Sequence, residues 1–399
     1  MLDPMNLSEN TALWWNKLLS FWREREGLST PVADPYRLTE EEKYQLSKVL
    51  QGLSRGLTGE RSLAGESYMK GAGLGAYLLY FWPVSFTQLQ WIWHLVPFRQ
   101  KRRVLDLASG PGPLALAALE AGAGEVWASD PSIPALALAK DLARSQGWTL
   151  HTHPWSAGES LPPGPWDIIT LGHGLNEVGV NLPDKVGFRA SVIQSAIDSL
   201  SPQGRLYWME PASTGVNREM LAVRDELLLR GMKPLAPCLW ESTCPALGES
   251  GGTCHASFSW TPPRGFEALA WAARLGKEEL KMTWFVYGPR SEIIQKPAGR
   301  IFRVVGDFLI NKAGRKRIYL CGTEGRLSLS AIQAKGETWR SSFEDLKRGD
   351  LIRVTDPETR ESGLGLLETS RLEVVKKAYR EPVKEIPRYA KKIGYRPRS

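Results

Sequence analysis

Cysteine and long apolar runs are both scarce in this sequence of 399 residues. Only four cysteines occur, and no apolar run reaches about eighteen residues, so we expect no membrane span. The first ten residues lack the charged and then apolar pattern of a secretory signal and the arginine-rich character of a transit peptide. These absences favour a cytoplasmic protein, whose length allows two or three domains with cores of their own.

An evenly spread basic charge is also lacking. The net charge is +8, yet residues 371–399 contain ten Lys or Arg against three Glu, so the rest of the chain is nearly neutral. Tyr379, Tyr389 and Tyr395 are spaced so that bases could stack on them. The tail is therefore either an arm that binds RNA or a solvated, disordered terminus, and we favour RNA because the excess charge is concentrated there.

The most informative stretch that the sequence does contain is residues 104–113. An apolar strand leads into a glycine loop, and the alanine- and leucine-rich helix of residues 114–120 follows. This order predicts a phosphate or nucleoside cradle at the carboxyl edge of a parallel sheet. Gly110 and Gly112 allow a sharp turn and a close approach of a ligand, and we expect Asp106 to face that ligand.

Two features favour S-adenosylmethionine over NAD as the ligand of this loop. Asp106 precedes Gly110 by four residues, where a methyltransferase can hold the methionine end of its cofactor. A second strand, residues 125–129, ends in Asp130, whose carboxylate can accept both ribose hydroxyls. Asp130 would also suit NAD, and Ala108 stands where most methyltransferases have glycine. A glycine turn without any cofactor is the third interpretation of this stretch.

Strands alternate with helices of ten to fifteen residues over about 99–290, which predicts an α/β fold. We expect the doubly wound parallel sheet of class I methyltransferases. The predicted domains are a helical module at 1–95, a cofactor domain at 96–282 with a cysteine loop at 236–256, a small β domain at 283–370 and the basic tail at 371–399. The β domain, which would include a strand at 284–287, is either a barrel of the oligonucleotide-binding type or an extension of the first sheet.

The loop after the predicted strand 166–172 should stand over the reactive end of the cofactor. It contains His173, Asn176 and Glu177, which we predict as catalytic candidates. His173 or Glu177 could act as a base, but a polar loop that borders the pocket is equally compatible with the sequence. The loop lacks the Pro-Pro-Tyr pattern with which many methyltransferases hold an exocyclic amine.

The four cysteines suggest an inorganic centre. Cys238, Cys244 and Cys254 lie in one loop rich in proline and glycine, and Cys321 follows a predicted strand. The gaps of five, nine and sixty-six residues fit the paired spacing of zinc sites poorly and an iron-sulfur cluster better. Disulfides, which a cytoplasm disfavours, and four unrelated buried thiols are also compatible with the sequence.

Basic residues also gather on one predicted hairpin of the β domain. Lys312, Arg315, Lys316 and Arg317 occur within six residues. A nucleic-acid-binding face and a solvated turn explain this cluster equally well.

The chain resembles the methyltransferase-like family associated with the small ribosomal subunit of mitochondria, together with its bacterial homologues. The matching stretches are residues 76–83, 105–112, 236–255 and 320–325, among which the cysteine set is the most specific. The resemblance implies S-adenosylmethionine at residues 106–112 and Asp130, a 4Fe-4S cluster on the four cysteines, and contact with small-subunit ribosomal RNA. One departure is that Leu239 and Trp240 follow the first cysteine, where the family often has Pro-His.

Three hypotheses follow. The first is an enzyme that methylates small-subunit RNA. The second, which we favour, is an RNA-bound assembly factor that keeps the methyltransferase fold and cofactor, with catalysis unproven, and is a monomer off the ribosome. The third is a zinc-stabilised methyltransferase acting on a small molecule or protein, which would leave the basic tail unexplained.

Overall fold

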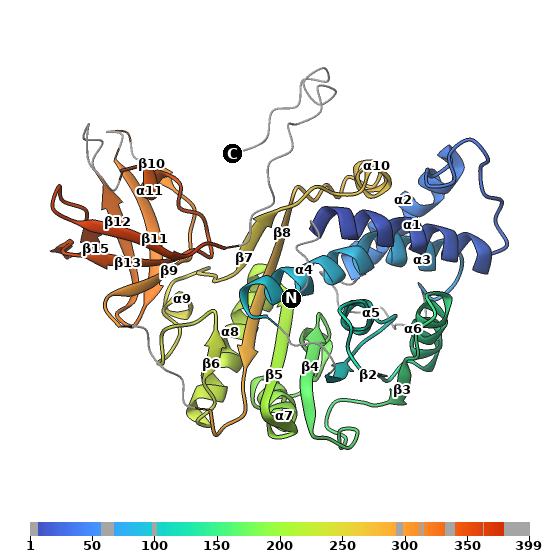
Figure 1. Ribbon diagram of the computed structural model, residues 1–399, viewed down its shortest axis with the longest axis horizontal. Helices are drawn as coiled ribbons and strands as arrows, with labels where there is room; N and C mark the ends of the chain where they lie inside the picture. The colour runs from blue at the N-terminus through green and yellow to red at the C-terminus, as the bar shows by residue number, and fades with distance from the viewer. Residues whose placement is uncertain are drawn as a thin grey trace.

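The computed structural model describes residues 7–56, 68–97, 102–292, 298–310, 312, 315–331, 340–361 and 363–378. The fold contains two β-sheets. Helices cover the first, and the second is formed by strands of the C-terminal part of the chain and lies to one side of the first (Figure 1). Among the described helices none is long and apolar enough to cross a membrane.

The first sheet combines a parallel half with an antiparallel half. Its strand order is β3-β2-β1-β4-β5-β8-β6, with β7 paired to β8. The first five strands of this order are parallel, whereas β8 runs antiparallel to β5, β6 and β7. The strands are β1 Arg103–Leu107, β2 Glu125–Asp130, β3 His151–Pro154, β4 Trp166–Gly172, β5 Leu200–Pro211, β6 Pro234–Ala236, β7 Ala256–Ser259 and β8 Glu279–Tyr287.

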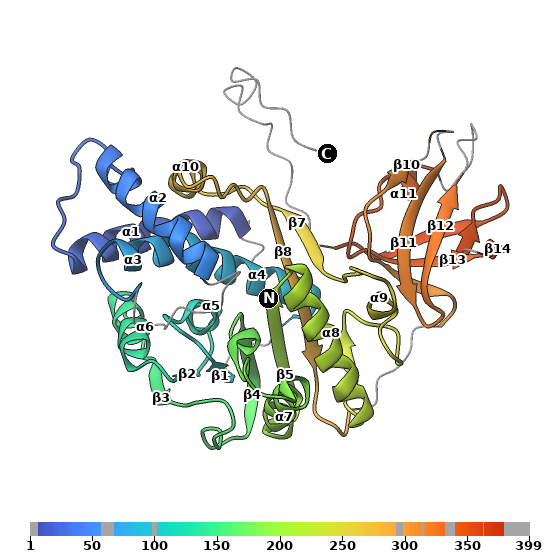
Figure 2. The same cartoon turned by 180° about the vertical axis from the view of Figure 1, so that it is seen from behind.

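Helices cover both faces of this sheet, because its strands alternate apolar side chains between two hydrophobic cores. Val104 packs into one core, with α4, α5 and α6, and Leu105 into the other, with α7 and α8. Figure 2 shows α7 and α8 on the face opposite to α4. The covering helices are α4 Trp82–Leu95, α5 Pro113–Glu120, α6 Ile133–Ser145, α7 Lys185–Asp198 and α8 Thr214–Leu229.

The predicted N-terminal helical module is present in the described residues. Thr39 and Glu42 form a capping box that starts α2. The tryptophans of α1 are buried, and Trp14 packs against α4, with the Trp14 and Trp82 rings 5.0 Å apart. The remaining helical segments of this half are α1 Leu7–Arg25, α2 Glu40–Arg55, α3 Gly71–Ala76, the π-helix η3 Tyr77–Phe81, the 3-10 turn η4 Leu175–Glu177, α9 Pro245–Gly248 and α10 Arg264–Ala272.

The second sheet is a separate unit with its own core of buried apolar residues, including Phe302, Ile318 and Ile352. Its order is β14-β15-β12-β11-β9-β13-β16, with β10 paired to β11, and its β12–β15 pair is parallel. A meander of three strands, a helix before the fourth strand, and a fifth strand parallel to the third make up the oligonucleotide-binding (OB) fold. The elements are β9 Ile301–Val304, β10 Leu309–Ile310, β11 Lys316–Gly322, β12 Gly325–Ala331, α11 Arg340–Glu344, β13 Leu351–Thr355, β14 Glu358–Arg360, β15 Gly363–Gly365 and β16 Arg371–Lys376.

One predicted strand belongs to a different sheet from the one expected. Residues 284–287, which we assigned to the small β domain, lie in β8 and pair with β5 of the first sheet. The antiparallel β8 completes the methyltransferase sheet, and nothing in its short apolar pattern says which sheet it joins. The structure therefore combines a class I methyltransferase fold with an OB-like sheet after it.

Candidate functional site

A cavity of about 750 Å³ lies at the carboxyl ends of β1, β2 and β4. It is bordered by the glycine loop after β1, by Asp130 at the end of β2 and by the loop after β4, with η3 and α4 on the other side. Seven of the predicted site residues line this cavity: Asp106, Ala108, Gly110, Asp130, His173, Asn176 and Glu177. Gly112 is not among the lining residues and instead starts α5 with a left-handed φ of 75°.

The Asp106 side chain makes hydrogen bonds on both sides of the glycine loop. Its Oδ1 accepts a hydrogen bond from the Thr170 hydroxyl (2.7 Å), and its Oδ2 accepts one from the Ala115 backbone N–H (3.0 Å) at the start of α5. Burial raises the pKa of the Asp106 carboxyl to about 7, although these two hydrogen bonds lower it. Asp106 therefore fixes the turn into α5.

Asp130 ties the glycine loop to the second strand. Its Oδ2 accepts from the Gly110 N–H (2.8 Å) and its Oδ1 from the Ser132 N–H (2.9 Å). Burial raises the pKa of the Asp130 carboxyl, whereas the two backbone hydrogen bonds lower it. Since an ionised carboxylate can accept about four hydrogen bonds, each oxygen can accept one more from a ligand.

Ala108, the departure from the usual glycine, is accommodated by a glycine elsewhere. Its φ is 50°, a left-handed conformation that favours glycine. The loop after β4 packs directly against it, so closely that a Cβ on Gly174 would collide with the Ala108 methyl group. Glycine at position 174 thus leaves the space that the side chain of Ala108 occupies.

His173 adopts a left-handed backbone conformation, φ 61°, directly above the cavity. Gln88 fixes its tautomer: the Gln88 amide N–H₂ donates to the Lys281 carbonyl, so its oxygen accepts from His173 Nε2–H (2.8 Å). Nδ1 is then the nitrogen that can accept a proton. Burial, together with the charge of Lys277, lowers the pKa of His173 to about 4. The imidazole is therefore neutral near pH 7.

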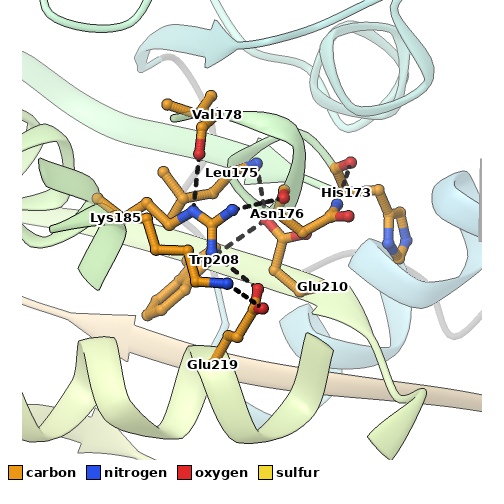
Figure 3. Close-up of polar contacts among 9 residues, drawn as sticks. His173, Leu175, Asn176, Val178, Lys185, Trp208, Glu210 and Glu219 are labelled. Atoms are coloured by element: carbon orange, nitrogen blue, oxygen red, sulfur yellow. Dashed lines mark hydrogen bonds and ion pairs between the residues drawn. The ribbon is translucent and has the colours of Figure 1, made fainter. Parts of the chain in front are cut away.

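Asn176 and Glu177 have different surroundings, although they are adjacent. The Asn176 amide donates to the buried Glu210 carboxylate (2.8 Å), which also accepts from the Leu175 N–H (2.9 Å) (Figure 3). Burial raises the pKa of Glu210 to about 7. Asn176 thereby fixes the loop backbone, whereas Glu177 is exposed at the rim of the cavity.

Arg189 of α7 holds the far side of the same loop. Its guanidinium donates to the carbonyls of Val178 (2.8 Å) and Asn176 (2.7 Å) and pairs with Glu219 (2.9 Å), which also pairs with Lys185 (Figure 3). The Arg189 side chain is completely buried. One arginine therefore links the loop after β4 to α8.

We expect Arg189→Met to lower the free energy of unfolding by about 3 kcal/mol, because two buried carbonyls lose their donor and Glu219 loses one of its partners. Urea denaturation followed by tryptophan fluorescence measures this loss. Arg144→Met is the control, since its guanidinium is exposed and pairs with Asp141 of the same helix, α6, and it should cost less than about 1 kcal/mol. Equal losses in the two variants would contradict the role given to Arg189.

Among the many lining residues that were not predicted from the sequence are Tyr68, Tyr77, Gln88 and Lys277. Tyr77 and Tyr68 stack with ring centroids 5.1 Å apart, and the Tyr77 hydroxyl lies 3.5 Å from the point that a Cβ on Gly110 would occupy. Tyr77 belongs to the π-helix η3, a distortion common at functional sites. Gln88 and the buried Lys277 line the same cavity. The π-turn has no sequence signature, and Lys277 lies between α10 and β8 without any motif.

The four cysteines come together between the two sheets. Burial raises the pKa of the Cys254 thiol, and the charges of Cys238, Cys244 and Cys321 raise it further. Each sulfur is therefore near enough to the others for electrostatic interaction. Cys321 is contributed by β11 of the second sheet, and the other three by the loop between β6 and β7. That the four thiols bind one inorganic centre stays a prediction.

Helix α8 supports the cysteine loop from one side. Arg218 donates to the four backbone carbonyls of Ala246, Leu247, Glu249 and Gly252 at 2.9 to 3.1 Å. The N–H of Cys244 donates to Asp225 (2.8 Å) and the N–H of Cys254 to Asn217 (3.1 Å). These contacts give an irregular loop a defined shape.

Three arginines lie close enough to the thiols to interact with them electrostatically: Arg224, Arg303 and Arg326. The Nε atoms of Arg224 and Arg326 are buried and have no hydrogen-bond partner among the described residues. Arg224 pairs with Asp225 (2.6 Å) and Arg326 with Glu249 (3.3 Å), so part of the cationic charge beside the thiols is already balanced. Across the described ranges, however, no three His, Cys, Asp or Glu side chains are grouped closely enough to hold a metal ion.

The predicted basic surfaces are only partly described. Lys312 and Arg317 are exposed, whereas Lys316 pairs with Glu344 at 2.8 Å. Residues 371–378 of the tail form β16 and its end, and the prediction for residues 379–399, with Tyr379, Tyr389 and Tyr395, lies outside the described residues.

Residues 87–247 match the family model of a methyltransferase domain. Similar solved structures include a Thermoplasma acidophilum protein, which is 14% identical, with 63% of this chain and 98% of that one covered and a TM-score of 0.33. The ribosomal protein L11 methylase of Lactobacillus delbrueckii is 20% identical, with 37% of this chain and 70% of that one covered and a TM-score of 0.29. TrmN of Thermus thermophilus is 20% identical, with 52% of each chain covered and a TM-score of 0.31. No curated protein matches the chain. The match places a methyltransferase domain, a type that uses S-adenosylmethionine, over the cavity-forming part of the chain.

Proposed function

We propose that this protein binds S-adenosylmethionine and small-subunit ribosomal RNA and assists assembly of the small ribosomal subunit or translation. The observation that carries the proposal is the cavity at the end of β1, where a glycine loop and two carboxylates border one space within the methyltransferase domain. Its volume, about 750 Å³, suits a nucleoside cofactor together with part of a second ligand.

Asp130 would hold the ribose of the cofactor, because each of its oxygens can accept another hydrogen bond. The backbone of Gly110 would approach the methionine end, beneath the Tyr77 hydroxyl. When bound, the cofactor supplies an electrophilic methyl group on a sulfonium. NAD is the competing ligand that the same Asp130 would accept.

Methylation of ribosomal RNA is the part of the proposal with the weakest chemical support. A general base works best when its pKa is near the working pH, and His173, with a pKa of about 4, is far from it. Glu177 is at the rim and Asn176 is engaged with Glu210. We therefore favour binding and assembly over catalysis as the main role.

A 4Fe-4S cluster on Cys238, Cys244, Cys254 and Cys321 is part of this proposal. The four interacting sulfurs are the donor set that such a cluster uses, and an anionic cluster would place further negative charge beside Arg224, Arg303 and Arg326. When present, the cluster supplies a covalent connection between the cysteine loop and β11.

Zinc is the alternative occupant. A tetrahedral zinc ion with Zn–S bonds of about 2.3 Å draws its thiolates to roughly 4 Å of one another. No grouping tight enough to hold a metal ion occurs among the described residues, which favours neither occupant, so the preference for a cluster rests on the spacing of the cysteines along the chain. With zinc, the chain would be a stabilised methyltransferase for a small molecule or protein.

Calorimetry on the full chain, purified without oxygen, tests the proposal. We expect S-adenosylmethionine to bind with a Kd of about 10⁻⁴ M or lower, since polar contacts to a cavity of this size support at least that affinity, and a single-stranded segment of small-subunit ribosomal RNA to bind in a salt-dependent manner. NADH and a polyglutamate peptide are the controls. Absence of both kinds of binding would refute the proposed function.

A further inference from the structure

The OB-like sheet has a basic pocket that neither the cofactor cavity nor the cysteines use. It measures about 300 Å³ and lies across β11 and β12, between the β10 segment and the strands β14 and β15. Three arginines, Arg315, Arg317 and Arg360, and two serines, Ser328 and Ser330, line it. No carboxylate is among its lining residues in the described part of the chain.

The strand pairing explains how these residues meet on one face. Arg317 of β11 is directly opposite Ser330 of β12, and Ser328 is opposite Gly363 of β15. Side chains directly opposite one another point to the same face of a sheet. The intervening residues Ile318 and Leu329 point the other way, into the core. The outer face of β11 and β12 therefore carries only polar and basic groups at this point.

Arg360 is held in place rather than extended into solvent. Its Nη1 donates to the Ser330 hydroxyl (3.0 Å), and its Nε (2.6 Å) and Nη2 both pair with the Glu358 carboxylate. The guanidinium lies across β15, where a Cβ on Gly365 would collide with it. A fixed guanidinium loses less entropy on binding an anion than a free one, because its fork is already oriented.

The rim of the pocket adds flat and apolar surface. Leu309 and Ile310 of β10 are 47% and 64% exposed, and the Arg317 guanidinium lies over the Tyr319 ring, 5.4 Å from its centroid. Exposed apolar side chains beside clustered arginines are what a nucleotide needs: charge for its phosphate and apolar surface for its base.

We infer that this pocket binds a nucleotide of single-stranded RNA, with its phosphodiester on Arg315, Arg317 and Arg360 and its base against Leu309 and Ile310. The pocket lies on the face of the second and third strands of the OB-like sheet, between the loop that joins its first two strands and the loop that joins its last two. OB folds bind oligonucleotides with these parts. The inference rests on the RNA binding proposed above and assigns it to one site.

The test compares single-stranded RNA binding by the wild type and by Arg315→Gln/Arg317→Gln, measured as fluorescence anisotropy of a labelled oligouridylate over a salt series. We expect affinity at low salt to fall about 10- to 100-fold and the slope of log K against log salt to fall by roughly 1.4, because two phosphate contacts on a single strand are lost. Arg360→Gln should weaken binding independently. A labelled polyglutamate peptide is measured in parallel.

Lys140→Gln/Lys347→Gln removes the same charge from exposed positions on α6 and after α11, and it should leave the slope unchanged. Equal losses in this control, or no loss in the arginine variants, would overturn the pocket while leaving RNA binding by the wild type intact. A parallel loss of the peptide would identify a general anion patch and also overturn the inference. A wild type that binds no RNA would remove the RNA part of the proposed function and the pocket with it.

Discussion

Replacement of Cys254 by serine is expected to remove most of the iron from protein purified without oxygen. Cys254 is half-buried and interacts with all three other thiols, so serine removes one of four ligand bonds from the proposed cluster. Metal sites of this kind bind with on the order of 10 kcal/mol, and loss of one ligand should lower bound iron about tenfold or more. Iron and sulfide analysis, with the charge-transfer absorbance, measures the change.

The same variant should also melt earlier, by roughly 10 °C, because the free energy of ligand binding is lost from the folded state. Ser242→Ala is the matched control: the side chain is exposed in the same loop, and only its carbonyl is used, by Arg224. Unchanged iron in Cys254→Ser would contradict the cluster. One zinc ion per wild-type chain, without sulfide, would replace the cluster by zinc as the occupant.

The part of the fold that the sequence predicts best is the part with a periodic pattern. The strand of residues 166–172 is observed with those bounds as β4, and the helix predicted at 114–120 differs by one residue from α5. Buried parallel strands followed by amphipathic helices produce local patterns that do not depend on distant contacts. The OB-like unit was only one of two possibilities, because short strands do not reveal their pairing order.

The candidate site divides in the same way. The glycine loop and Asp130 could be predicted, because they lie at strand ends and the ends of parallel strands meet. Tyr77, Gln88 and Lys277 could not, because they reach the cavity from η3, α4 and the loop before β8. The role of Asn176 in fixing the loop depends on Glu210, which is thirty-four residues away in the chain. Hydrogen bonds of this kind are not visible in one sequence.

The arginines around the cysteines could not be predicted from the cysteine motif alone. The sequence supplied the four thiols, but Arg218 and Arg224 come from α8, a helix without any motif. Arg303 connects β9 to the cysteine loop by donating to the Pro237 carbonyl (2.7 Å). The charged groups and the loop shape around the four cysteines thus come from residues that only the folded chain brings near them.

Replacement of Asp130 by alanine is expected to weaken S-adenosylmethionine binding about 100-fold. The variant would lose two hydrogen bonds from ribose hydroxyls to the carboxylate, each worth on the order of 1.5 kcal/mol for a charged acceptor. Their sum of about 3 kcal/mol corresponds to roughly two decades of affinity. The Gly110 N–H would also lose its acceptor, so the loop that faces the methionine end would be less ordered. Calorimetric titration of the full chain measures the loss.

Two further variants separate ribose binding from loss of structure. Asp130→Asn has the same shape, but its amide oxygen can accept from only one of the two backbone N–H groups, so it should fold with a modest loss of stability and bind the cofactor about tenfold more weakly, since one charged acceptor is lost. Asp345→Ala removes an exposed carboxylate after α11 and should bind normally. If Asp130→Ala binds S-adenosylmethionine as tightly as the wild type does, the cofactor site is elsewhere. If the wild type prefers NADH, the loop is a dinucleotide site, because the same carboxylate serves both ribose-containing ligands.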